Sequence, residues 1–219
     1  MKLSEQTNLI LRNFSTINPG IFVKKGKVLK TMSPVKTVFT VANIEEEFPM
    51  DFAIYDLNKF IGSLGLFASP ELTFEPSYVT ISEGKQKVRI KYADPSVIVA
   101  PPDKDIKVKT QDVQFHIESS NLQRILRSLG VLGLTEVAMV GEEGVIYLQS
   151  INSKTNETGS DSFSIEVGET NNNFQANFKS ENMKFMNKDY DVTLSFTGIA
   201  EFKSDNITYY IPCEATSRF

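Results

Sequence analysis

The sequence predicts an α+β protein of two similar domains, each built from antiparallel sheets with two short helices. Residues 119–129 repeat residues 4–14 at an offset of 115, and a shorter match follows at an offset of 125. The stretches between these matches are short alternating or β-branched runs bounded by turn residues, which is typical of strands. Few strands precede a helix of crossover length, so a duplicated domain with antiparallel sheets fits better than a doubly wound parallel sheet.

The first repeat predicts one amphipathic helix in each half. Apolar residues recur at i, i+3, i+4 and i+7 in 7–14 and in 122–129, which indicates a buried helix face. Ser4 and Ser119 are expected to cap the two helices by accepting a hydrogen bond from a first-turn amide. The matched positions are Ser4, Ile10, Leu11, Arg12 and Phe14 in the first half, and Ser119, Ile125, Leu126, Arg127 and Leu129 in the second.

The second repeat predicts a further helix in each half, over 57–64 and about 180–187. Asp56 and Ser180 are the expected caps of these helices, and Gly133 suits the end of the helix that begins near 119. The matched positions are Asp56, Lys59, Phe60 and Ile61, followed by Glu181, Lys184, Phe185 and Met186.

Between the helices of both halves, short strands joined by turns are expected, giving antiparallel sheets backed by helices on one face. The proline-containing stretch at about 93–112 is expected to be a stiff connector, because proline removes ladder donors. The predicted domains are 1–108 and 109–219. The expected strands are 21–23, 28–29, 38–41, 52–55, 72–74, 78–81 and 88–90, then 113–117, 137–140, 145–151, 163–167, 174–178, 192–196, 199–202 and 207–211.

Composition excludes several classes of protein. With 219 residues, 41% of them hydrophobic and 23% charged, the chain is of ordinary globular type. The net charge of −4 excludes a generally basic coat, so any contact with nucleic acid must come from a local basic stripe. The N-terminal residues show no signal-like apolar stretch, and no apolar run approaches a membrane span. A reducing cell interior and no membrane partner are therefore expected.

Catalytic chemistry finds no support in the residue types. His116 is the only histidine, and it lies on the polar face of its predicted strand. Cys213 is the only cysteine, with no histidine near it in sequence. Metal ligands at local spacing and glycine-rich phosphate loops are both missing. We expect no catalytic residue, no metal and no cofactor.

Basic residues are better organised than any catalytic group. Arg124 and Arg127 lie away from the apolar face of their helix, and Arg12, Lys59, Lys184 and Lys188 are placed similarly on the others. For one helix the ordinary reading is a solvated polar face. Across four helices of an acidic protein, the pattern favours contacts to phosphates, which need no sequence reading.

A second basic row follows a strand pattern, with Lys85, Lys87, Arg89 and Lys91 at every other position. Exposed lysines commonly protect an edge strand from mispairing. Pairing with an acidic edge of a partner is the other reading. The connector poses a similar choice, because Val97, Ile98 and Val99 are apolar enough either to pack onto the domains or to line a groove.

Taken together, these residues resemble the DNA polymerase sliding clamps of T-even-type tailed phages. The resemblance covers nearly the whole chain, although the strands at 72–92 and the loops after Gly141 match poorly. The motifs that carry it are Met1-Lys2-Leu3-Ser4 with Asn13-Phe14 and Thr16-Ile17-Asn18, Ala53-Ile54-Tyr55-Asp56-Leu57-Asn58, Ala93-Asp94-Pro95-Ser96 with Val99-Ala100-Pro101, Leu122-Gln123 with Leu126-Arg127, and Phe219.

The resemblance implies a DNA-clamp fold assembled head to tail as a homotrimeric closed ring. Such a ring encircles duplex DNA without sequence preference and tethers the replicative DNA polymerase in the cytoplasm of the infected bacterium. A clamp loader and late-transcription factors are further implied partners. The alternative is a β-rich oligomeric phage structural or scaffold protein that does not encircle DNA.

Three sets of site residues follow from the resemblance. The subunit contact is a hypothesis that pairs the basic row of one subunit with the acidic strand at 160–167 of the next. The expected sets are Lys2, Arg12, Lys59, Arg124, Arg127, Lys184 and Lys188 facing DNA; Val97, Ile98, Val99, Pro101, Tyr210, Ile211 and Pro212 around a partner-peptide pocket; and Lys87, Arg89, Lys91, Asp161 and Glu166 at the subunit interface.

Overall fold

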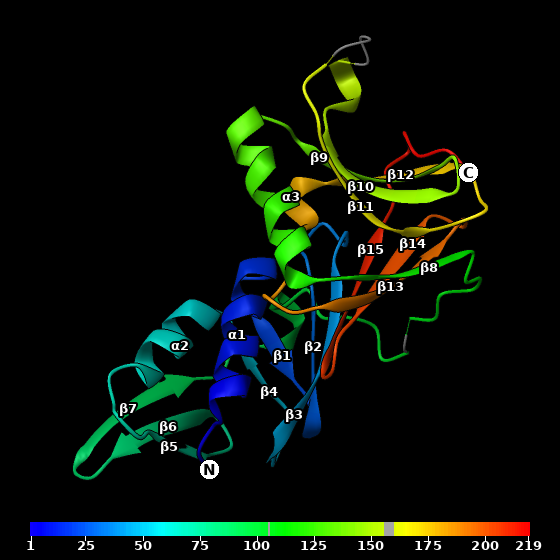
Figure 1. Cartoon of the computed structure of the whole chain (residues 1–219). Helices are drawn as coiled ribbons and strands as arrows, with labels where there is room; N and C mark the ends of the chain where they lie inside the picture. The colour runs from blue at the N-terminus through cyan, green and yellow to red at the C-terminus, as the bar shows by residue number, and fades with distance from the viewer. Residues whose placement is uncertain (105, 156–159) are drawn as a thin grey trace. The chain divides into compact units, whose positions relative to one another are not determined.

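The computed structural model describes residues 1–104, 106–155 and 160–219 (Figure 1). The chain divides into two compact units, Met1–Lys104 and Asp105–Phe219. In the described residues, unit 1 has two α-helices and unit 2 has one, and each unit has its own antiparallel ladders and its own buried core. In the described part of the chain, no helix has the length and apolar character needed to cross a membrane.

Unit 1 contains two helices, α1 (Glu5–Ile17) and α2 (Leu57–Leu64), which lie side by side (Figure 1). The predicted apolar faces are the buried ones in both helices. Ser4 caps α1 by accepting from the Thr7 amide at 3.2 Å, and Asp56 caps α2 by accepting from the Lys59 amide at 2.8 Å. The two caps predicted for the first half are therefore confirmed.

The strands of unit 1 form three antiparallel groups. β1 pairs with β4, β2 pairs with β3, and a three-stranded sheet has the order β5-β6-β7. A single 3-10 turn, η1 (Pro95–Val97), follows the last strand. The strands are β1 (Ile21–Val23), β2 (Gly26–Met32), β3 (Phe39–Phe48), β4 (Phe52–Ile54), β5 (Glu71–Phe74), β6 (Tyr78–Glu83) and β7 (Gln86–Lys91).

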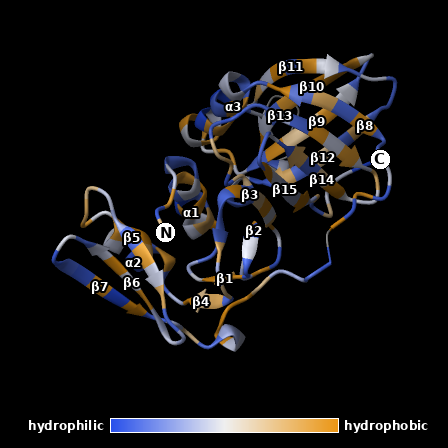
Figure 2. Ribbon diagram, turned by 90° about the horizontal axis from the view of Figure 1, so that it is seen from below, coloured by the Kyte–Doolittle hydropathy of each residue, from blue (hydrophilic) through white to orange (hydrophobic). Residues whose placement is uncertain are grey.

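Unit 2 contains two antiparallel ladders and the helix α3 (Ser119–Leu132), which packs on β10 and β11. One ladder has the order β11-β10-β9-β12 and the other β15-β14-β13-β8. Apolar and polar residues alternate along several of these strands (Figure 2). The strands are β8 (Val113–Ile117), β9 (Glu136–Glu142), β10 (Val145–Ile151), β11 (Phe163–Glu169), β12 (Phe174–Lys179), β13 (Tyr190–Ser195), β14 (Ile199–Lys203) and β15 (Ile207–Pro212).

The start of α3 differs from the prediction, while its end agrees. Ser119 is the first residue of the helix and not its cap, and its amide donates to the Asp189 carboxylate at 2.7 Å. The helix ends at Gly133, whose φ of 66° lies in the left-handed region that glycine adopts without strain. A carboxylate distant in sequence thus satisfies the first amide of the helix, and the expected side-chain cap does not form.

The prediction of a helix at about 180–187 is wrong. Only a 3-10 turn forms there, η3 (Ser180–Asn182), and Ser180 is not its cap. The side chain of Phe185 enters an aromatic cluster, with ring centroids 4.6 Å from Phe202 and 5.0 Å from Tyr209. The backbone of Met186 is bonded to two tyrosine hydroxyls: its carbonyl oxygen accepts from Tyr190 at 2.8 Å, and its amide donates to the Tyr209 hydroxyl oxygen at 3.2 Å. Packing of Phe185 therefore outweighs the local helical periodicity.

Candidate nucleic-acid and partner interfaces

The basic residues predicted on the first three helices are all exposed. Arg12 lies on α1 and Lys59 on α2, whereas Arg124 and Arg127 lie one turn apart on α3. Each side chain is on the face opposite the buried residues of its helix. These four cations are therefore free to meet phosphates from solvent-facing helix surfaces.

The three remaining basic residues predicted to face DNA have different surroundings. The Lys2 ammonium donates to Ser69 Oγ at 2.9 Å and lies 3.7 Å from the Glu71 carboxylate. Lys188 is only 23% exposed and donates to Asn206 Oδ1 at 3.1 Å. Lys184 is exposed, but it follows η3 and does not sit on a helix face. Of the seven, Lys188 is the least available to a ligand.

The part of the connector that lies in unit 1 has one buried residue, Ile98, next to an exposed one, Val97. Ile98 is buried, at 9% exposure, with its side chain over Gly20, whereas Val97 is 56% exposed. The side-chain amide of Asn18 donates to Val99 O at 3.1 Å and to Met32 O at 2.8 Å. The connector therefore packs onto unit 1 through Ile98, while Val97 stays available to a partner.

An apolar residue that the sequence analysis did not single out lies close to this connector. Val35 is 75% exposed in the loop between β2 and β3. The side-chain amide of Asn18 donates both to Met32, the last residue of β2, and to Val99 of the connector. The loop that follows Met32 therefore begins close to Val99. The signal in the sequence is weak, since one valine beside Pro34 in a turn attracts no notice.

The predicted pocket residues of unit 2 belong to β15 and are exposed to different degrees. Tyr210 and Pro212 are half-buried, whereas Ile211 is fully buried. Burial, followed by the charge of Glu214, raises the pKa of the neighbouring Cys213 thiol to about 12. This cysteine is therefore protonated near neutral pH and a poor nucleophile.

The two strands proposed for subunit contact both end their sheets. β7 is terminal in β5-β6-β7, and β11 is terminal in β11-β10-β9-β12. Lys87, Arg89 and Lys91 are exposed, with the Arg89 guanidinium 5.1 Å from the ring centroid of Tyr78. Asp161 and Glu166 are exposed too. Opposite charge is thus presented at the edges of two different sheets.

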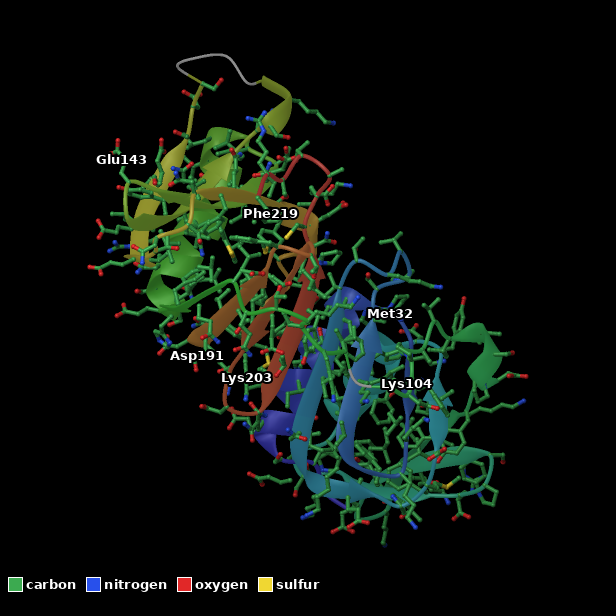
Figure 3. The ribbon with its side chains drawn as sticks, turned by 90° about the vertical axis from the view of Figure 1, so that its right-hand side faces the viewer. Met32, Lys104, Glu143, Asp191, Lys203 and Phe219 are labelled. Atoms are coloured by element: carbon green, nitrogen blue, oxygen red, sulfur yellow. The ribbon has the colours of Figure 1, made fainter. Side chains whose placement is uncertain are left out.

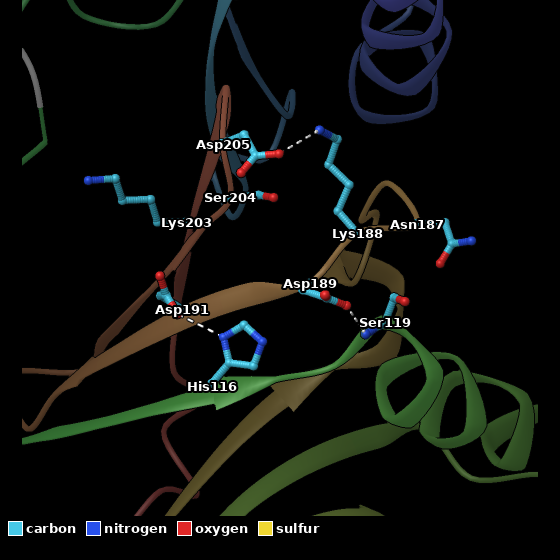
Figure 4. A pocket seen from close by; sticks show the side chains of 9 residues that line it. All are labelled: His116, Ser119, Asn187, Lys188, Asp189, Asp191, Lys203, Ser204 and Asp205. Carbon is cyan, nitrogen blue, oxygen red and sulfur yellow. Dashed lines mark hydrogen bonds and ion pairs between the residues drawn. The ribbon is translucent and has the colours of Figure 1, made fainter.

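A polar cavity of about 630 Å³ lies at the start of α3 (Figure 4). The His116 ring on β8 lies 2.8 Å from the Asp191 carboxylate on β13 (Figure 4). Lys203 lies opposite Asp191 on the next strand, β14 (Figures 3 and 4). In the residues that the structure describes, no group of three potential metal ligands occurs. The lining residues are His116, Ser119, Asn187, Lys188, Asp189, Asp191, Lys203, Ser204 and Asp205.

Paired antiparallel sheets with helices and exposed basic helix faces define a DNA-clamp type of protein, and comparisons with known proteins agree. A family model described as DNA polymerase processivity factor matches residues 3–100, and one described as gp45 sliding clamp, C terminal, matches residues 114–215. The sliding clamp of Escherichia phage RB69 is 32% identical, covering 99% of this chain and 98% of that one. The sliding clamp of Vibrio phage KVP40 is 29% identical, covering 98% and 100%.

Solved structures show the same fold at low sequence identity. The proliferating cell nuclear antigen of Entamoeba histolytica has a TM-score of 0.70 at 14% identity, covering 95% of this chain and 94% of that one. The corresponding protein of A. fulgidus, solved with the C-terminal region of FEN-1, has a TM-score of 0.73 at 11% identity, covering 99% and 98%.

The chain belongs to the sliding clamp family of DNA polymerase processivity factors. The resemblance identified from the sequence and the predicted function in phage DNA replication are therefore confirmed. The comparisons give no support to the alternative of a phage structural protein.

Proposed function

We propose that the chain closes into a homotrimeric ring around duplex DNA and acts by holding a polymerase there, without chemistry of its own. The observation that carries this proposal is the pair of sheet-terminal strands with opposite charge, β7 and β11. A head-to-tail contact between two different edges repeats from subunit to subunit, and such contacts make a ring when the rotation closes. A loader that opens the ring, and late-transcription factors as further users of it, belong to the same proposal.

The faces of the two strands match as well as their charges. On β7, Val88 and Ile90 lie opposite Ile81 and Val79, both fully buried, so they share the core face of the sheet. On β11, Ile165 lies opposite the buried Leu148. Pairing β7 with β11 would continue an apolar core face across the subunits.

The opposite faces carry the charges. Lys87, Arg89 and Lys91 alternate with the core-facing residues of β7, and Glu166 lies opposite Tyr147 on the other face of β11. Cross-strand pairs of opposite charge are favourable, whereas like charges are unfavourable. The charged face would therefore set the register, while the apolar face supplies most of the contact energy.

Charge reversal and charge exchange test this contact. Lys87→Glu with Arg89→Glu should weaken assembly by about 10- to 100-fold, because each attraction becomes a repulsion. Adding Asp161→Lys and Glu166→Lys to the same chain should restore it, because the charges are then exchanged between the edges. Lys27→Glu with Lys36→Glu changes the net charge equally and leaves β7 and β11 unaltered, so it is the matched control.

The measurement is molar mass against protein concentration, by sedimentation or light scattering. Trimers that dissociate at higher concentration in the reversed variant, and reform in the exchanged variant, support the contact. A reversed variant with the mass profile of the control would reject it.

Within the ring, we propose that Arg12, Lys59, Arg124 and Arg127 make weak phosphate contacts. Lys2 and Lys184 would contribute less directly, and Lys188 least, because its ammonium is engaged by Asn206. Contacts to phosphate carry no base information, so a chain held this way can slide along DNA. A phage replication protein acts where its DNA is copied, in the cytoplasm of the infected bacterium.

For partner peptides, we propose that Val97 is the principal exposed contact of the connector and that Val35 adds apolar surface beside it. Val99 and Pro101 are half-buried and would form the rim. Tyr210 and Pro212 are the partly exposed members of the set proposed in unit 2, whereas the buried Ile211 would support them. Exposed apolar side chains next to an anchored backbone suit the docking of a short apolar peptide.

A further inference from the structure

The outer edge of β12 is covered by the last residues of the chain. Gln175 exchanges two backbone hydrogen bonds with Arg218, each 2.8 Å long. The Asn177 amide donates to Ser217 Oγ at 2.9 Å, and Asn177 O accepts from the Glu214 amide at 2.8 Å. All four outward backbone groups of Gln175 and Asn177 are therefore satisfied by residues 214–219, which we call the C-terminal strap.

The strap ends on an aromatic platform. The Phe219 ring stacks on Phe196 with a centroid distance of 5.0 Å and an interplanar angle of 24°. Phe196 in turn lies 5.7 Å from Phe174, the first residue of β12. Phe219, labelled in Figure 3, is nevertheless 48% exposed, so the stacked ring remains accessible to solvent.

The strap is held with little burial. Ala215, Thr216 and Arg218 are exposed, and the Lys179–Glu214 ion pair is 3.7 Å long with both side chains partly exposed. Exposed ion pairs contribute little to stability. A polar cavity of about 450 Å³ lies between the strap and Ser153. Segments with few buried apolar contacts open at low cost in free energy.

We propose that the β12 edge and the Phe196 platform form a docking site for an extended segment of a partner protein, with the strap as its built-in competitor. An extended segment adds to a sheet edge through backbone hydrogen bonds, and pockets for alternate side chains give specificity. The strap shows what fits: a hydroxyl residue at the place of Ser217 and an aromatic residue two positions later. This site uses neither the subunit contact nor the connector.

A peptide with the sequence of the strap, Glu-Ala-Thr-Ser-Arg-Phe, is the probe, labelled at its N-terminus for fluorescence anisotropy. It is titrated with the full chain and with the full-length double variant Arg218→Pro, Phe219→Ala. Proline removes the amide that donates to Gln175 O, and alanine removes the stacked ring. A Lys203→Ala chain is the control for surface substitution, and the same peptide with Ala in place of Phe is the control for the platform.

The double variant should bind the probe about tenfold more tightly than the wild-type chain, because a competitor lowers apparent affinity by the fraction of open sites. The control chain should match the wild type, and the control peptide should bind neither. Equal affinity for wild type and variant, or no binding by a variant that circular dichroism shows to be folded, would overturn the proposal. If the double variant does not fold, Phe219→Ala alone is read by the same criteria, since it removes only a half-exposed ring.

Discussion

Replacing Ile98 by alanine should destabilise the protein, whereas replacing its neighbour Val97 should not. Ile98 is 9% exposed and packs over Gly20, while Val97 is 56% exposed. Ile98→Ala removes three carbon atoms beyond Cβ, at about 0.8 kcal/mol each, so the expected loss is about 2–3 kcal/mol. Val97→Ala lies at an exposed position, where changes are usually within about 0.5 kcal/mol.

Urea unfolding followed by circular dichroism measures both free energies, with an unchanged m-value as the check that the same transition is compared. Gly20→Ala tests the same contact by adding a methyl group at the residue on which Ile98 packs. Its Cβ would lie 2.7 Å from Ile98 Cδ1 and 3.0 Å from Tyr55 O, so about 1–3 kcal/mol of overpacking is expected. A loss below about 0.5 kcal/mol for both Ile98→Ala and Gly20→Ala would refute the anchoring of the connector.

Three further predictions concern pH, the missing helix and DNA contacts. Partial burial alone would raise the pKa of Glu46, but hydrogen bonds from Thr7 and Ser4 hold this pKa below its ordinary value of 4.5. The ionised Glu46 carboxylate therefore stabilises the folded protein above that pH, and this contribution is lost as the pH falls. Glu46→Gln should therefore flatten the fall in unfolding free energy below about pH 5, and an unchanged pH profile would contradict this. Phe185→Ala should cost about 3 kcal/mol in urea unfolding, and a loss below about 1 kcal/mol would contradict its role in the core. Arg127→Gln should lower the slope of log affinity for duplex DNA against log salt by about 0.9 for each subunit whose Arg127 contacts a phosphate, up to about 2.7 for a trimer, and Lys188→Gln by clearly less; equal slopes would contradict the assignment.

Periodicity predicted the helices wherever the buried face is local. The i, i+3, i+4, i+7 quartets place α1, α2 and α3 correctly, because every quartet residue is buried in its helix except Leu126, which is half-buried. The segment after Ser180 resembles α2 in sequence but not in structure. Its Phe185 packs against Phe202 and Tyr209, which come later in the chain, and no local sequence pattern indicates this contact.

The surface was predictable in part for the same reason. Alternation along β7 shows which residues share a face, so the exposed basic row was readable from the sequence. Hydrogen bonds between residues distant in sequence were not predictable in this way. Lys188 meets Asn206, and the Ser119 amide meets Asp189, through the fold alone. The strap shows the limit most clearly, because nothing in residues 214–219 alone indicates that they cover the edge of β12.

Retention on DNA of different topology tests the ring most directly. The protein is loaded on a closed circular duplex, freed of unbound chains by gel filtration at moderate salt, and the circle is then cut once with a restriction enzyme. A ring held by topology stays with the circle and is lost after the cut, whereas blocking both DNA ends with a bulky protein before gel filtration retains it. Dissociation at the same rate from closed, cut and end-blocked DNA would contradict encirclement.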